Sequence, residues 1–528
     1  MKKVRLFLVL AAMIAIMPMR AQEIGANELL KNYGKAKLEQ KASIEKDLIK
    51  IAKEVGVSND KAAKEELSKT LIAFVDGRDN PSCDEFVISL FKYFGTVNDI
   101  DRLNKYVENE RYPDAAIRAL AEIQPYANHI IKIVETSNGD LPHKDAYAYA
   151  IGRLKIVELE YLLHSWLKGA DDNLKLEIYT AFMRMGNDES MMLADKGAKK
   201  LFKKKDPKLK IGSMRILAAM EHEKAMPYFY KALKNKDMNV RRTALELMKP
   251  YATPEITANV VKKYAKKDAI ADIVWWIGEL QDKTQADFVI AQLSSQDPRA
   301  VEEAIHAVIK MDNNEGMEIV KTMFGGKYQP AIKAALIQTT TDNASFLKDV
   351  MKSDDNKKLC VLDILKEKRC VALYYNVVNA MNSNNPAVKD AAYKALKNVV
   401  TVTSADFLKT TLATCEEKYV EDVQEAIMMA MSKASDKQKD TFVQTMKEVQ
   451  PQAMPRFYKI FAYFKTETSI DKLVECYHSG IAKDKAFEAI MLIDNRDYAN
   501  VIKSLADEKD EYSERLMKKY NSLVNKKK

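Results

Sequence analysis

The architecture of this chain follows from a stretch that recurs along it and is most complete in Asp237-Met238-Asn239-Val240-Arg241-Arg242-Thr243-Ala244. Asp237 is suited to start a helix, because its side chain accepts a hydrogen bond from a backbone N–H of the first turn. Ala244, seven positions later, is small enough to let the helix lie close to a neighbour. Val240, Ala244, Leu247 and Met248 follow helical spacing, so the stretch predicts an amphipathic helix.

The same pairing of a turn residue with a small residue seven positions later occurs at four other places. These are Tyr112-Pro113 with Ala119, Asp206-Pro207 with Ser213, Asp297-Pro298 with Ala304, and Asn385-Pro386 with Ala392. The separations between successive marks are 94, 31, 60 and 88 residues, so all five fit one repeat of about 30 residues. Fainter marks fall where this repeat predicts them, near Asn80-Pro81, His143, Asp172, Asp268, Gln329-Pro330, Asp355, Val420, Pro451 and Lys483.

Between the marked helices lie second amphipathic segments, such as 226–233, 256–264, 286–293 and 407–412. A single helix pair cannot bury its apolar stripe, so each pair must stack on the next one. The chain also has only 16 Gly and 14 Pro in 528 residues, too few for the many turns of an all-β protein. We therefore predict an all-α chain, an α-solenoid of a dozen or more helix pairs of about 31 residues each.

The stretch from Asp237 to Ala244 resembles the D-x-x-V-R-x-x-A core of HEAT repeats, in the short variant of about 30 residues also found in bilin-lyase-like proteins. The other marks keep the turn residue and the small residue but usually lack the Arg. The resemblance covers roughly residues 70–495 and implies a superhelical stack used mostly as a binding scaffold. It does not imply bilin chemistry.

The N-terminus has the pattern of an export signal. Lys2, Lys3 and Arg5 precede a 12-residue apolar run, which is too short to span a bilayer, and a cleavage point follows at Ala21. We predict a signal peptide over residues 1–21 and a periplasmic or secreted mature chain, in which no later stretch is long and apolar enough to span a membrane. The Lys-Lys start and the Ala-Gln junction resemble export signals of the Bacteroidota type.

The rest of the chain divides into three predicted parts. Residues 22–70 are expected to form an N-terminal helical cap, residues 71–495 the repeat array without an internal boundary, and residues 496–528 a charged C-terminal cap or tail. The five cysteines, Cys83, Cys360, Cys370, Cys415 and Cys476, are widely spaced and odd in number, which does not indicate a disulfide framework. We expect small buried hydrophobic residues, with a Cys360–Cys370 bridge as the alternative.

The strongest charge feature is the Lys-rich segment 196–210. The next two repeats add further Lys and Arg residues, and equivalent positions of a solenoid line up, so a basic stripe is predicted. Its candidate binding residues are Lys199, Lys200, Lys203, Lys204, Arg241, Arg242, Lys262 and Lys263. Such a stripe suits an acidic protein, an anionic glycan or lipid headgroups, and the plain alternative is a solvated helix face.

Two adjacent tryptophans, Trp275 and Trp276, complete the set of candidate binding residues. Adjacent helical positions lie about 100° apart, so both rings cannot face the same core equally well. The favoured interpretation is that both rings are mostly buried at a joint between repeats. The other is that one ring packs between repeats and its neighbour is partly exposed, where it serves as a binding hot spot.

The sequence contains no recognisable catalytic, metal-binding or phosphate-binding motif, so we predict no enzyme activity, no cofactor and no metal. Nucleic acid is not an expected partner, because removal of residues 1–21 lowers the formal charge from +9 to +5 and Lys greatly outnumbers Arg. The leading hypothesis is an exported scaffold that holds another protein of the cell envelope. The alternatives are an accessory role in polysaccharide binding or breakdown, and an enzyme on a HEAT-like frame that resembles DNA alkylbase glycosylases.

Overall fold

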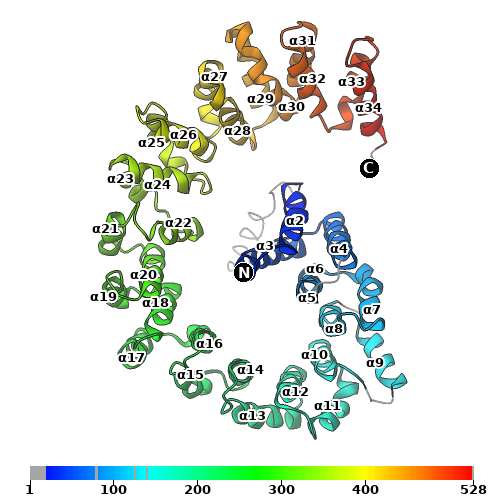
Figure 1. Cartoon of the computed structure of the whole chain (residues 1–528), viewed down its shortest axis with the longest axis vertical. Helices are drawn as coiled ribbons and strands as arrows, with labels where there is room; N and C mark the ends of the chain where they lie inside the picture. Colours follow the sequence, from blue (N-terminus) through cyan, green and yellow to red (C-terminus); the bar gives the residue numbers. More distant parts are fainter. Residues whose placement is uncertain (1–19, 78–80, 124–125, 138–140, 526–528) are drawn as a thin grey trace, which may run out of the picture. The chain divides into compact units, whose positions relative to one another are not determined.

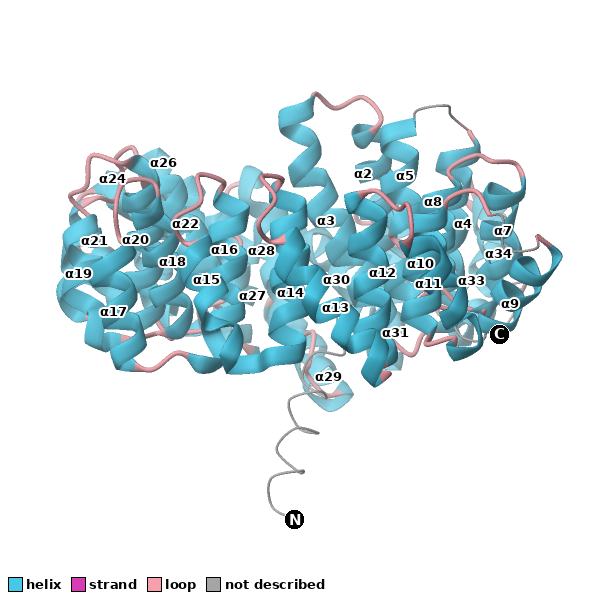
Figure 2. Cartoon of the chain, turned by 90° about the horizontal axis from the view of Figure 1, so that it is seen from below, coloured by secondary structure: helices cyan, strands magenta, loops and turns pink. Residues whose placement is uncertain are grey.

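The computed structural model describes residues 20–77, 81–123, 126–137 and 141–525. These residues form helices joined by turns, and no strand occurs among them (Figure 2). Within this part of the chain, no helix combines the length and the apolar character needed to cross a bilayer. The prediction of an all-α chain is confirmed.

The chain divides into two compact units, which meet between Thr253 and Pro254. The sequence analysis does not predict this division, because the turn at 252–253 resembles the turns between other repeats. The helices of the first unit are α2 (Arg20–Tyr33), α3 (Leu38–Val57), α4 (Lys61–Asp76), α5 (Pro81–Ser89), α6 (Phe91–Phe94), α7 (Ile100–Glu108), α8 (Pro113–Leu120), α9 (Ala127–Thr136), α10 (Lys144–Leu154), α11 (Glu160–Leu167), α12 (Asp172–Met185), α13 (Asp188–Leu201), α14 (Pro207–Glu221), α15 (Met226–Ala232) and α16 (Met238–Met248).

The second unit continues the same pattern of paired helices. Its helices are α17 (Pro254–Tyr264), α18 (Ala269–Leu280), α19 (Ala286–Gln292), α20 (Pro298–Met311), α21 (Asn314–Thr322), α22 (Gln329–Gln338), α23 (Ala344–Val350), α24 (Asp355–Leu365), α25 (Tyr374–Met381), α26 (Pro386–Ala395), α27 (Ala405–Thr414), α28 (Val420–Met431), α29 (Asp436–Gln444), α30 (Tyr458–Phe464), α31 (Glu467–His478), α32 (Lys483–Met491), α33 (Ala499–Ala506) and α34 (Ser513–Val524). Short 3₁₀ helices fill several of the connections, among them η3 (His222–Ala225) and η11 (Pro451–Phe457).

Each unit has two layers of helices. The even-numbered helices contact one another in chain order, from α8 to α16 in the first unit and from α18 to α32 in the second. They form the inner layer, on the inner side of the curve that each unit follows in Figure 1. The odd-numbered helices from α7 onward form the outer layer, and each packs against an inner-layer helix. This arrangement is the stack of helix pairs that the repeat predicts.

The predicted marks are the starts of the inner-layer helices. The five strong marks precede α8, α14, α16, α20 and α26, and most of the faint marks precede other inner-layer helices. The Pro451 mark begins η11 instead, and Asn80 lies outside the described residues. The capping role of the turn residue is confirmed: Asp237 accepts from the N–H of Val240 at 3.1 Å, and Asp206 accepts from that of Lys208 at 2.8 Å.

The small residue of each strong mark is buried: Ala119, Ser213, Ala244, Ala304 and Ala392 are all at most 1% exposed. Other small residues lie where inner-layer helices come closest, as where Gly278 of α18 meets Ala307 of α20. Each repeat thus starts an inner-layer helix at the mark and keeps side chains small at buried positions of that helix.

All five cysteines are free thiols, so the alternative of a Cys360–Cys370 bridge is wrong for this structure. Cys83, Cys415 and Cys476 are buried, while Cys360 and Cys370 are half-buried. Burial raises the pKa of the Cys476 thiol to about 11, which keeps it protonated and unreactive at neutral pH.

Several predictions about the ends of the chain stay predictions. Residues 1–19 of the expected signal peptide and residues 526–528 of the expected tail lie outside the described residues. The expected N-terminal cap contains α2, α3 and most of α4, and the expected C-terminal cap contains α33 and α34. The predicted boundaries of the repeat array at residues 70 and 495 stay predictions.

The close approach of α18 and α20 gives a test of the packing. A Cβ added at Gly278 would lie 2.6 Å from the Cβ and 2.7 Å from the Cα of Ala307, so the helices must move apart. We expect Gly278→Ala to lower the free energy of unfolding by about 1–3 kcal/mol, although Ala favours a helix more than Gly does. The matched control is Gly25→Ala in α2, where the new Cβ would meet only Ile51 at 3.9 Å. Thermal unfolding followed by circular dichroism should show a lower midpoint for Gly278→Ala and an equal or higher one for Gly25→Ala.

Candidate functional site

The predicted basic segment lies at one edge of the first unit. At this edge each outer-layer helix ends and the next inner-layer helix begins, through turns at 168–171, 202–206 and 233–237. Nine exposed lysines occupy these turns and the helix ends beside them: Lys168, Lys200, Lys203, Lys204, Lys205, Lys208, Lys231, Lys234 and Lys236. We call these residues the basic edge.

The lysines of the basic edge recur with the repeat. Lys200 and Lys231 occupy the last turns of α13 and α15, and they are 31 residues apart. Lys203 and Lys234, and likewise Lys205 and Lys236, show the same spacing in the two following turns. Because equivalent positions of stacked repeats line up, the lysines of neighbouring turns form a row instead of a scatter.

Two of the predicted binding lysines are already paired with acids. Lys199 forms ion pairs with Glu221 and with Asp195, and its hydrogen bond to Glu221 is the main reason that its pKa is raised. Lys204 pairs with Asp172 at 2.8 Å and thereby links two successive turns. The hydrogen bond from Lys204 is also the main reason that the pKa of Asp172 is lowered.

Lys200, Lys203 and Lys205 differ from these paired lysines. Among the described residues, no carboxylate lies within ion-pair distance of any of the three. Their ammonium groups are strongly hydrated point charges on flexible stems. They are therefore available to attract an acidic partner.

Arg241 is wrongly placed among the surface candidates. It is only 3% exposed, and its Nη1 donates to the backbone carbonyls of Asn235 and Lys236, both at 2.8 Å. The guanidinium thus holds the turn that precedes α16, which leaves its neighbour Arg242, half-buried, as the more accessible of the two. The motif gives no signal for this role, because no sequence pattern identifies the two carbonyl acceptors.

The remaining candidates belong to the second unit. Lys262 and Lys263 are exposed in the last turn of α17. Trp276 is fully buried and Trp275 is half-buried, so the two rings do lie in different environments, as their 100° separation predicts. A surface role for Trp276 is excluded in this conformation. The residues of the predicted basic stripe therefore belong to two units: those up to Arg242 lie in the first unit, and Lys262 and Lys263 lie in the second.

The sequence analysis misses a pocket beside the basic edge. Its volume is about 850 Å³, and it lies where the starts of three successive inner-layer helices, α10, α12 and α14, come together. It is lined by Leu141, His143, Lys144, Asp145, Ser165, Trp166, Lys168, Gly169, Ala170, Asp171, Asn173, Leu174 and Lys208. Sequence gives little signal for it, because its lining comes from three different turns.

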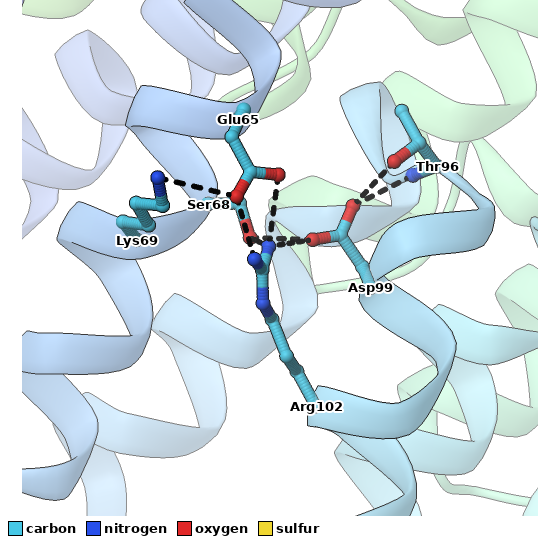
Figure 3. A network of polar contacts seen from close by, with 6 residues as sticks. All are labelled: Glu65, Ser68, Lys69, Thr96, Asp99 and Arg102. Atoms are coloured by element: carbon cyan, nitrogen blue, oxygen red, sulfur yellow. Dashed lines mark hydrogen bonds and ion pairs between the residues drawn. The ribbon is translucent and has the colours of Figure 1, made fainter.

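A buried polar network elsewhere in the first unit has a structural explanation. Arg102 of α7 donates to Glu65 and to Ser68 of α4, with Nη2 to Glu65 Oε1 at 2.6 Å, and also to Asp99 at 3.0 Å (Figure 3). Asp99 in turn accepts from the backbone and hydroxyl of Thr96. The hydrogen bond from Arg102 lowers the pKa of Glu65. Each residue drawn in Figure 3 has a polar partner within the network, which joins α4 to α7.

No group of three or more His, Cys, Asp or Glu residues within the described ranges is arranged to hold a metal ion. Comparison with known proteins gives little further information. No family model matches the chain, and no curated protein matches it.

Solved structures give distant matches. One matching chain comes from a structure of Kap95p bound to RanGDP, which concerns nuclear import complex assembly; it is 12% identical, and the match covers 95% of this chain and 75% of that chain with a TM-score of 0.40. Another comes from a crystal structure of an engineered protein, which is 16% identical, with 77% of this chain and 98% of that chain covered and a TM-score of 0.20. Similarities at this level assign neither a function nor a partner.

The role of Arg241 can be tested by substitution. Arg241→Met removes the donor to two carbonyl groups, and we expect the free energy of unfolding to fall by about 1–3 kcal/mol. Lys236→Met removes the same charge from an exposed position of the same turn, and it should change stability by less than about 0.5 kcal/mol. Urea unfolding curves of both variants measure the difference, and equal midpoints would show that Arg241 is not a structural residue.

Proposed function

We propose that this protein is a non-catalytic binding scaffold whose first unit holds an acidic protein partner along the basic edge. The observation that carries the proposal is the row of exposed lysines repeated at 31-residue spacing, at Lys200 and Lys231, Lys203 and Lys234, and Lys205 and Lys236. A row of like charges on one edge creates a positive potential that attracts an extended acidic chain.

The lysines stand on a rigid support. Asp171, Asp206 and Asp237 cap the helices that follow the three turns, with hydrogen bonds of 2.8 to 3.1 Å to backbone N–H groups. These carboxylates are engaged at helix starts, so they neutralise the neighbouring lysines less than free acids would. The arrangement favours binding without a large rearrangement of the backbone.

The chemistry of the edge favours a protein over the other anionic partners. All nine cations are Lys, whereas nucleic-acid phosphates and bases are preferentially bound by Arg, and Arg241 is used inside the turn. A glycan partner is favoured by an exposed tryptophan platform, which neither the fully buried Trp276 nor Trp166, at 7% exposed, provides. An acidic protein segment needs neither feature.

We also propose a cellular location for the protein and its partner. The N-terminal pattern of Lys2, Lys3 and Arg5 before an apolar run supports export to the periplasm or the outside of the cell. The partner is then another protein of the cell envelope. The capped-helix repeat supports assignment to HEAT-like repeat proteins, and the export signal supports a Bacteroidota-like source.

Charge reversal tests the basic edge directly. A double variant, Lys200→Glu with Lys231→Glu, should weaken binding of a short fluorescent polyglutamate peptide by roughly tenfold, because two attractions become repulsions. The matched control is Lys155→Glu with Lys224→Glu, which reverses two exposed lysines at the opposite ends of α10 and α14. Fluorescence polarisation at low salt gives the affinities.

Two results would contradict the proposal. Equal weakening by the control variant would mean that only net charge matters and that the edge is not a site. The second is tighter binding of polygalacturonate than of polyglutamate, with that binding lost in the Lys200 and Lys231 variant. This result would mean that the basic edge binds a glycan and not a protein.

A further inference from the structure

We infer that the pocket beside Trp166 receives an aromatic side chain of the acidic segment that lies on the basic edge. The inference rests on the proposed function, because the pocket and the edge are continuous: Lys168 and Lys208 belong to both. A pocket that receives one side chain fixes the register of the bound segment, whereas a row of lysines alone does not.

The pocket has an apolar side. Leu141, Trp166, Ala170 and Leu174 contribute to its lining, and the first three are at most 9% exposed, so this side is a firm, packed surface. The hollow has a volume of about 850 Å³ and is open to solvent, and it is large enough to admit an aromatic ring. A large ring can therefore enter and replace water against these residues.

The pocket also has a cationic side. Lys144, Lys168 and Lys208 are among its lining residues, and the Lys144 ammonium lies 6.0 Å from the centre of the Trp166 ring. An aromatic ring among ammonium groups gains a cation–π attraction in addition to apolar contact. Acidic residues that flank the ring would meet the same lysines.

The acids and the histidine of the pocket are engaged by the protein itself. Asp145 pairs with Arg118 at 3.2 Å, and Asp171 accepts the backbone N–H of Leu174 at 2.8 Å. His143 lies 3.1 Å from Asp114. The charge that the pocket offers to a ligand is thus carried by Lys168 and Lys208, which favours a ring in an acidic context over a ring in a basic one.

A carbohydrate ring fits this pocket less well than a side chain does. The Trp166 ring offers little open face to either ligand, but a neutral sugar also carries no charge for Lys168 and Lys208. The occupant that satisfies both sides of the pocket is an aromatic residue between Glu and Asp residues. Aromatic residues are also the usual energetic anchors of protein interfaces.

Two synthetic peptides test the inference. Both are fluorescent chains of Glu and Asp, and they differ only at the central residue, which is Phe in one and Ser in the other. We expect the Phe peptide to bind the full chain about tenfold more tightly, because burial of an aromatic anchor commonly dominates binding. The advantage should persist at high salt, where the charge contribution shared by both peptides is screened.

A blocking variant locates the effect. Asn173 is an exposed lining residue in the first turn of α12, so Asn173→Trp fills the pocket without altering a buried contact. It should remove the advantage of the Phe peptide and leave binding of the Ser peptide unchanged. Asn239 occupies the same position in the first turn of α16 and is also exposed, so Asn239→Trp is the matched control and should change neither affinity.

The outcomes separate the two proposals. If both peptides bind equally well to the unmodified chain, or if Asn173→Trp leaves the Phe advantage intact, the pocket is not the anchor, while the basic edge stands. If neither peptide binds at low salt, the basic edge itself is wrong and the pocket inference falls with it. Circular dichroism of both Trp variants confirms that the comparison is made between folded proteins.

Discussion

The close contact between successive inner-layer helices is the constraint on which the rest of this structure depends. Where Gly278 of α18 meets Ala307 of α20, there is no room for another carbon atom, and the small residues of the five strong marks are all buried as well. Each repeat can stack only if this face stays small, because interiors pack as densely as organic crystals. The repeat length and the position of the caps follow from that contact.

Stacking in this way places the same kind of turn at the same edge in every repeat. The turn must provide a cap for the inner helix and satisfy the last carbonyls of the outer helix. In the turn before α16, Asp237 does the first. The backbone N–H groups of Lys234 and Asn235 do the second by donating to Lys231 and Ala232, and Arg241 binds two carbonyls within the turn itself. In the first unit, exposed lysines occupy positions just before the capping Asp, at 203–205 and at 234 and 236. Structure and proposed function thus use neighbouring residues of the same turns.

The sequence predicts the parts of this protein that depend on local chemistry. Asp206-Pro207 and Asp297-Pro298 mark helix starts because capping and proline geometry are properties of a few consecutive residues. The different burial of Trp275 and Trp276 was one of two interpretations of that pair, and it follows from helical geometry. Arg241 was placed at the surface because its hydrogen bonds reach back to carbonyls that no sequence pattern identifies. The pocket beside Trp166 was missed because it exists only after three turns have been stacked.

The central claim is that the edge where outer helices end and inner helices begin, in the first unit, is the surface that binds. Hydrogen exchange measured by mass spectrometry, with and without saturating polyglutamate, tests it most directly. The account predicts slower exchange in the turns at 168–171, 202–206 and 233–237 and unchanged exchange in the turns of the opposite edge, 155–159 and 222–225. Protection of the opposite edge, or equal protection of both edges, would contradict it.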